Sequence, residues 1–194
     1  WSISCILYWW HRTWRGKNTI SKLQEYIEEL KENIKNLGLK REEEIIRYVY
    51  INLGQKMDFD LNYTFGNKSE KQSIYCGGKS EEDLEKAFQT HTAICKSISY
   101  MLEKILKEFD IEIQTVKLNG SPHMHNIVTL KNGKNYVLDL EDDLEFIQSG
   151  AKTRSFGKPV KIEDYDFFEN GRKFYNIINS EKTDDESEAR DMLT

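Results

Sequence analysis

The spacing of apolar residues changes once along this chain of 194 residues. In residues 20–53 and 80–109 they recur at intervals of three and four, the repeat of a helix that buries one face. From Ile111 onward apolar and polar residues alternate, the repeat of a half-buried strand. Helices followed by a run of strands predict an α+β domain, in which a helical N-terminal lobe precedes an antiparallel β-sheet.

Start and stop signals place the expected elements. Gly38 stands where a helix would end, and Ser80 opens Ser-Glu-Glu-Asp, which is typical of a helix start. Asn132-Gly133 is the strongest short signal for a β-hairpin. We expect the regular apolar stripe of the first helix to pack in a core rather than form a coiled coil. The predicted helices span residues 20–37, 40–53, 80–88 and 93–109, and the predicted strands span 111–118, 125–130, 135–140, 158–162 and 173–178.

The two ends of the chain differ in composition from its middle. Residues 1–17 hold all four tryptophans and end in basic residues. They are interpreted as the end of a transmembrane anchor, as an aromatic anchor at the membrane interface, or as an artefactual start. Residues 18–180 are expected to form one domain. Residues 181–194 are rich in Asp and Glu and predict a disordered tail.

Charge and cysteine content narrow the class of protein. A formal net charge of −5 disfavours a large nucleic-acid interface, which needs clustered Lys and Arg. The three cysteines, Cys5, Cys76 and Cys95, are widely spaced and show no Cys-x-x-Cys motif. We therefore expect a chain in the cytoplasm or at the cytoplasmic face of a membrane, with a secreted chain left open as an alternative. We expect no cofactor.

One cysteine has partners for chemistry downstream. Cys95 lies in the first turn of the last predicted helix, where the helix N-terminus can stabilise a thiolate and an oxyanion. His123 could serve as its base, and Asp139 on the next predicted strand could orient that base. Hence order and spacing permit a Cys-His-Asp triad made of Cys95, His123 and Asp139.

Two alternatives remain open for the same residues. His125 shares a strand face with His123, so it is an alternative base. His123 and His125 together with Asp139 or Cys95 could also form a zinc site with one open position, as in a zinc-dependent hydrolase.

The segment that carries these residues resembles the transglutaminase-like core of the papain-like cysteine fold. That core reads Cys-helix, strand, His-x-x-Asn-x-Val, a Gly-containing turn, an aromatic, then Asp. This chain has Cys95 at a helix start and then His123-Met-His-Asn-Ile-Val-Thr-Leu-Lys-Asn-Gly-Lys-Asn-Tyr-Val-Leu-Asp139. The match covers roughly residues 90–145, under a third of the chain. Ala93, Asn135 and Leu140 depart from the residues usual in the family.

The resemblance implies an acyl-transfer enzyme that acts on an amide of a protein or peptide through a thioester, as a protease, deamidase or transglutaminase. It makes His123 the base, Asp139 the orienter, and Asn126 and Val128 framework residues. Gln89, six residues before Cys95, matches the papain-like spacing of an oxyanion donor; Tyr63 or Tyr75 are alternatives for that role. An inactive member of the family that serves only to bind partners is the alternative function.

Overall fold

The computed structural model describes residues 20–61, 78–118, 122–159 and 165–167. In the described residues four helices precede the strands of the main sheet, and a fifth helix lies between two of those strands; this mixture confirms the α+β class. The helices are α2 (Lys22–Leu37), α3 (Glu42–Gly54), α6 (Glu81–Thr90), α7 (Cys95–Lys107) and α8 (Leu140–Gln148). The strands are β1 (Asp58–Phe59), β2 (Thr92–Ala93), β3 (Glu112–Leu118), β4 (Met124–Thr129), β5 (Asn135–Leu138), β6 (Lys158–Pro159) and β7 (Tyr165–Phe167).

Five strands form one antiparallel sheet in the order β6-β5-β4-β3-β7. The predicted hairpin around Asn132-Gly133 is confirmed: Leu130 N–H donates to the Lys134 carbonyl at 3.0 Å, and Gly133 has a φ of 79°. Glycine adopts this left-handed backbone without the penalty that a Cβ would bring. The hairpin pairs Asn126 with Leu138, which brings the start of β4 beside the end of β5.

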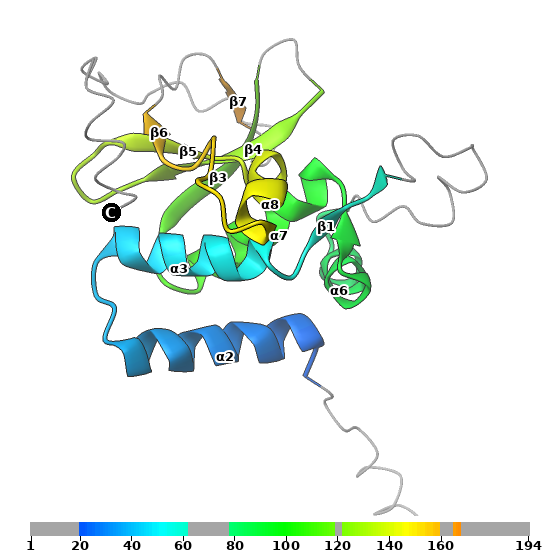
Figure 1. Ribbon diagram of the computed structural model, residues 1–194, viewed down its shortest axis with the longest axis horizontal. Coiled ribbons are helices and arrows are strands. Elements are labelled where there is room, and N and C mark those ends of the chain that lie inside the picture. Colours follow the sequence, from blue (N-terminus) through cyan, green and yellow to red (C-terminus); the bar gives the residue numbers. More distant parts are fainter. Residues whose placement is uncertain (1–19, 62–77, 119–121, 160–164, 168–194) are drawn as a thin grey trace, which may run out of the picture.

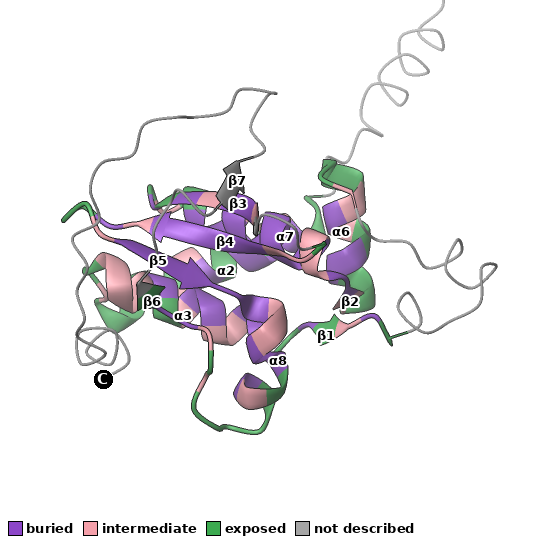
Figure 2. Ribbon diagram, turned by 90° about the horizontal axis from the view of Figure 1, so that it is seen from above, coloured by how far each residue is buried: buried purple, intermediate pink, exposed green. Residues whose placement is uncertain are grey.

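The helices cover one side of the sheet in layers (Figure 1). Helix α7 packs on β3 and β4, α3 packs on α7, and α2 lies farthest from the sheet against α3 and α6. Figure 2 shows buried residues gathered on α7, β4 and β5, while the helices farther from the sheet alternate between buried and exposed residues. The helix that begins with Cys95 is therefore the central helix of the domain.

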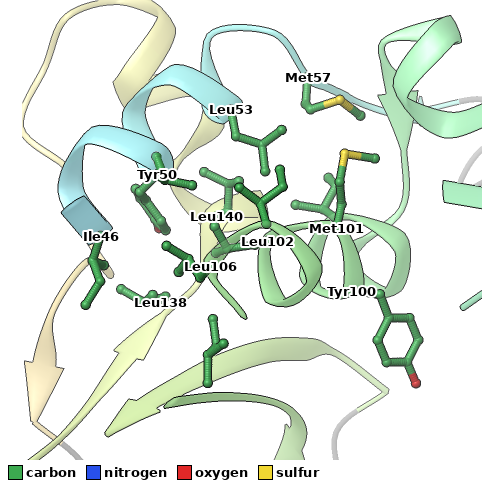
Figure 3. Packing of buried hydrophobic residues seen from close by; sticks show 14 of the residues in the cluster. Ile46, Tyr50, Leu53, Met57, Tyr100, Met101, Leu102, Leu106, Leu138 and Leu140 are labelled. Atoms are coloured by element: carbon green, nitrogen blue, oxygen red, sulfur yellow. The ribbon is translucent and has the colours of Figure 1, made fainter. Parts of the chain in front are cut away.

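Side chains from the five described helices and the sheet form one continuous core. Those from α3 and α7 interdigitate near the end of β5 and the start of α8 (Figure 3). Residues at this junction that are buried to 2% exposure or less are Ile46, Tyr50, Leu53, Met57, Met101, Leu102, Leu106, Leu138 and Leu140. Because the same core holds α7, β5 and α8, it fixes the relative positions of the elements that carry the candidate site.

Helix α2 ends at Gly38 as expected, and it begins one residue after a serine cap that was not expected. Ser21 caps α2 by accepting a hydrogen bond from the Gln24 N–H, and Gly38 ends it with a φ of 69°. Its apolar stripe lies in the core, as expected, apart from its two ends. Ile20 is 57% exposed and Leu37 is 60% exposed, because Ile20 precedes the cap and Leu37 is the last helical residue.

Helix α8 and the strands β1, β2 and β7 were not expected from the sequence. Asp139 caps α8, and acidic residues fill its first turn, where the helix dipole favours negative charge. Buried Asp143 accepts hydrogen bonds from the Tyr50 hydroxyl at 2.7 Å and from the backbone N–H groups of Arg154 and Ser155. This carboxylate thereby ties α8 to α3 and to the loop that follows α8.

Several expectations concern residues outside the described ranges. They include the tryptophan-rich segment 1–17, the domain limit at residue 180, the acidic tail 181–194 and the strand expected at 173–178. The strand expected at 158–162 is present as β6, and its last three residues are also outside. Within the described ranges, no helix is both long and apolar enough to cross a bilayer.

Candidate active site

Cys95 is the first residue of α7, and a short strand pair fixes its position. Strand β2 ends at Ala93, two residues before Cys95, and pairs with Phe59 of β1. The Ala93 carbonyl also accepts a hydrogen bond from the Asp60 N–H at 2.9 Å. Cys95 is half-buried and its thiol is free. The unpaired N–H groups of a helix N-terminus favour negative charge at such a sulfur and at an oxyanion beside it.

His123 and Asp139 meet across two neighbouring strands. His123 directly precedes β4 and Asp139 directly follows β5, and the β4–β5 register brings these two ends together. The His123 Nε2 lies 2.7 Å from the Asp139 Oδ2. The other oxygen of Asp139 accepts a hydrogen bond from the Asp142 N–H at the start of α8. Asp139 therefore both caps α8 and orients the His123 ring.

Cys95 completes this chain of contacts. Its side chain hydrogen-bonds to the His123 ring, and its Sγ lies within 4.8 Å of a ring nitrogen of His123. The hydrogen bond to Asp139, followed by that to Cys95, raises the pKa of His123 to about 10. The folded protein thus favours the imidazolium form of His123, which is the partner that a thiolate at Cys95 requires.

Glu141 is a further member of the site that the sequence analysis did not identify. Its Oε2 lies 3.2 Å from the Nδ1 of His123, and it also lies within 4.8 Å of the Cys95 sulfur. Burial raises the pKa of Glu141, an effect that the nearby His123 partly opposes. In the sequence, the sign of this role was the position of Glu141 two residues after Asp139. That position becomes informative only when α8 is known to begin at Leu140.

His125, the alternative base, lies next to His123. It is buried, its ring centroid is 5.8 Å from that of His123, and its Nδ1 is 3.9 Å from the Asp139 Oδ2. Burial lowers the pKa of His125, so its neutral form is favoured. The hydrogen bond to Cys95 comes from His123, which makes His123 the better-placed base.

Asn126 connects the elements that carry the site. It is fully buried, and its Nδ2 donates to the carbonyl of Ser99 on α7 and to the hydroxyl of Thr115 on β3, both at 3.0 Å. One side chain of β4 thus joins the helix that begins at Cys95 to the sheet that positions His123. This is the framework role that the resemblance implies for Asn126.

Gln89 is not part of this group of contacts. It lies on the exposed side of α6, where its Nε2 donates to Glu85 at 2.6 Å. Glu85 in turn accepts hydrogen bonds from the backbone N–H groups of Lys22 and Leu23 at the start of α2. An oxyanion role for Gln89 therefore stays a prediction. Tyr63 and Tyr75 lie outside the described residues.

Two overlapping groups of side chains offer metal-ligand atoms within 4.8 Å of one another. One consists of Cys95, His123 and Glu141, and the other of His123, His125 and Asp139. In the second group the contact of 2.7 Å between His123 and Asp139 is a hydrogen-bond distance. Two ligands of a tetrahedral zinc ion, each about 2.0–2.2 Å from the metal, would stand farther apart, at about 3.3 Å. The observed geometry fits a proton between these atoms better than a metal.

Comparison with known proteins adds little at this distance. No protein-family model and no curated protein matches the chain. A solved structure described as that of a TGase superposes with a TM-score of 0.47 and 16% sequence identity. The superposition covers 71% of this chain and 37% of that one, so this chain spans well under half of that structure's length. At such a level of similarity the match carries no argument about activity.

Proposed function

We propose that this protein is a cysteine-dependent acyl-transfer enzyme that acts on an amide of a protein or peptide through a thioester intermediate. The observation that carries the proposal is the continuous chain of contacts from Asp139 through His123 to Cys95 at the N-terminus of α7. It supplies a nucleophile, a proton carrier and a group that orients the carrier, in the order that nucleophilic catalysis needs.

Acylation would start from the thiolate of Cys95 and the imidazolium of His123. The sulfur attacks the carbonyl carbon, and the carbonyl oxygen takes up the negative charge near the backbone N–H groups that begin α7. Because Asp139 occupies Nε2, the nitrogen left to exchange a proton on the substrate side is Nδ1. That proton passes to the leaving nitrogen, the C–N bond breaks, an amine departs and a thioester to Cys95 remains.

Deacylation would reverse the roles of the two groups. Neutral His123 takes a proton from the incoming nucleophile, which attacks the thioester carbonyl, and the C–S bond breaks to restore the thiolate of Cys95. Water as nucleophile gives hydrolysis of a peptide bond or deamidation of a glutamine. An amine as nucleophile gives transamidation.

The family resemblance supports the same chemistry. The central helix that begins with the cysteine, and the antiparallel strands that end at the histidine and the aspartate, have the arrangement that a transglutaminase-like core implies. We therefore propose a transglutaminase-like enzyme, with a protease, a deamidase and a transglutaminase as the three forms of the activity.

An acylation experiment tests the proposal without a known substrate. 4-Nitrophenyl acetate is mixed with the protein, release of 4-nitrophenolate is followed, and the acetylated residue is located by peptide mass spectrometry. We expect a burst of about one equivalent on Cys95, with hydroxylamine-sensitive acetyl groups, that is lost in C95A and H123A. H91N, which changes an exposed histidine held away from the site, is the matched control.

Two outcomes would overturn the proposal. One is acetylation of Cys95 that is no faster than that of a free thiol and does not depend on His123, as expected of an inactive binding module. The other is one equivalent of tightly bound zinc in the purified protein, with Cys95 protected until a chelator removes it, as expected of the zinc hydrolase.

A further inference from the structure

Glu141 places a second carboxylate beside the candidate nucleophile. It lies in the first turn of α8, 3.2 Å from the Nδ1 of His123 and within 4.8 Å of the Cys95 sulfur. Its side chain keeps 22% of its surface exposed, so it is in contact both with the site and with solvent. Its Oε2 approaches the same ring nitrogen that faces the substrate in the proposed mechanism.

The neighbouring acidic residues of α8 are engaged elsewhere. Asp142 pairs with the guanidinium of Arg154 and accepts from the Ser155 hydroxyl. Asp143 is buried against the Tyr50 hydroxyl and the backbone after α8. Glu141 is thus the acidic residue of this turn that contacts the reacting pair. It adds one negative charge to a thiolate, an imidazolium and the Asp139 carboxylate, which together already carry a net charge of −1.

We propose that Glu141 determines charge specificity at this site: its carboxylate disfavours anionic groups next to the reacting carbonyl and favours cationic or neutral ones. For substrates this rests on the proposed function, and it predicts amides flanked by basic rather than acidic side chains. A charge about 5 Å away in a partly exposed site changes the rate of a charged reagent by about tenfold. Without Glu141 the thiolate, the imidazolium and Asp139 already carry a net charge of −1, so Glu141 strengthens the exclusion of anions at this site.

Two alkylating reagents, one neutral and one anionic, measure the effect of Glu141 on charge specificity directly. Iodoacetamide and iodoacetate share the same leaving group and similar size, and they differ by one negative charge. Any change in the intrinsic reactivity of Cys95 alters both rates together, so their ratio isolates the effect of charge. Peptide mass spectrometry restricts the measurement to Cys95, because Cys5 and Cys76 are also present in the chain.

The rate ratio of iodoacetamide to iodoacetate is measured at pH 7.5 for the full chain and for E141Q, E141D and E145Q. We expect E141Q to lower the ratio about tenfold, since it removes the charge and keeps the shape. E141D should keep most of the ratio. E145Q removes a charge from an exposed position one helical turn further along, so it should leave the ratio unchanged.

A ratio equal in the unaltered protein and in E141Q would overturn the inference, as would an equal fall in E145Q, which would indicate only long-range charge. If E141Q does not fold, the salt dependence of the ratio in the unaltered protein decides: it should fall toward that of a free thiol as ionic strength rises. Slow alkylation by both reagents, independent of His123, would refute the proposed function instead. The two failures are therefore distinguishable.

Discussion

Asp139 performs two tasks that one pair of substitutions can separate. Its Oδ2 holds His123 at 2.7 Å, and its Oδ1 caps α8 through the Asp142 N–H. Asn is as good a helix cap as Asp, so D139N should keep the cap and lose the charge, whereas D139A should lose both.

The magnitude follows from the contacts of His123. Its pKa is raised to about 10, and the hydrogen bond to Asp139 is the largest cause. Loss of one carboxylate at this distance lowers a histidine pKa by about 1–3, or about 1.4–4 kcal/mol of preference for the imidazolium. A substrate turnover that depends on this orientation should fall by about 10²–10⁴ in D139N.

NMR titration of the histidine ring signals measures the pKa of His123, and thermal unfolding measures the cap. We expect the pKa of His123 to fall in both variants. Both should also lose the stability that this contact gives, and the midpoint of D139A should lie roughly 2–4 °C below that of D139N, for a further loss of about 1 kcal/mol from the missing cap. An unchanged pKa of His123 in D139N would refute the assignment of Asp139 as its orienting partner. A drop in stability of D139N equal to that of D139A would refute the capping argument.

The raised pKa of His123 also predicts how stability depends on pH. Above pH 6.5 the unfolded protein loses the proton that the folded protein keeps on His123. The free energy of unfolding should therefore decline from pH 6.5 toward about pH 10, and it should decline less in H123A. Denaturant melts across this range check the sign, and an equal slope in both proteins would contradict it. N126A should destabilise the fold by about 2–4 kcal/mol, because it leaves the buried Ser99 carbonyl and Thr115 hydroxyl without the Asn126 donor. A thermal midpoint lowered by less than about 2 °C would contradict the supporting role of Asn126. D143A should lower the free energy of unfolding by about 2–4 kcal/mol, because three hydrogen bonds to one buried carboxylate are lost. The same denaturant melts measure this change, and unaltered stability would show that other contacts hold the loop after α8.

Local patterns were sufficient to predict much of the scaffold. The cap at Ser80 and the stop at Gly38 act within one helical turn, and the Asn132-Gly133 hairpin joins strands that are adjacent in sequence. The same hairpin brings His123 to Asp139, since it fixes the register of the two strands between them. For this reason the proximity of these two residues could be predicted from their order along the chain.

Features that depend on distant segments could not be predicted in this way. Strands β1 and β2 pair through two residues each and so position the chain before Cys95. Strands of two residues are too short to be recognised from the sequence. The expected strand at 135–140 ends at Leu138, and the acidic residues after Asp139 fill the first turn of α8, where they suit a helix N-terminus. The place of Glu141 beside Cys95 depends on both features together.

Gln89 shows what spacing alone leaves open, and its oxyanion role stays a prediction. Its offset from Cys95 matched an oxyanion donor, but α6 continues to Thr90 and the amide of Gln89 bonds to Glu85 one turn earlier. A side chain at a given offset faces the site only if the backbone between them has the expected conformation. Here that backbone is a helix end with His91 in the left-handed region, followed by the strand β2.

The central claim is that Cys95 and His123 form a thiolate–imidazolium pair, and the rate of Cys95 alkylation by iodoacetamide as a function of pH tests it most directly. The account predicts fast modification of Cys95 at pH 6, where an ordinary thiol is almost fully protonated and slow, with a loss of at least about tenfold in H123A and little change in H91N. Alkylation of Cys95 at pH 6 that is no faster than that of a free thiol, or that is equally fast in H123A, would contradict the account.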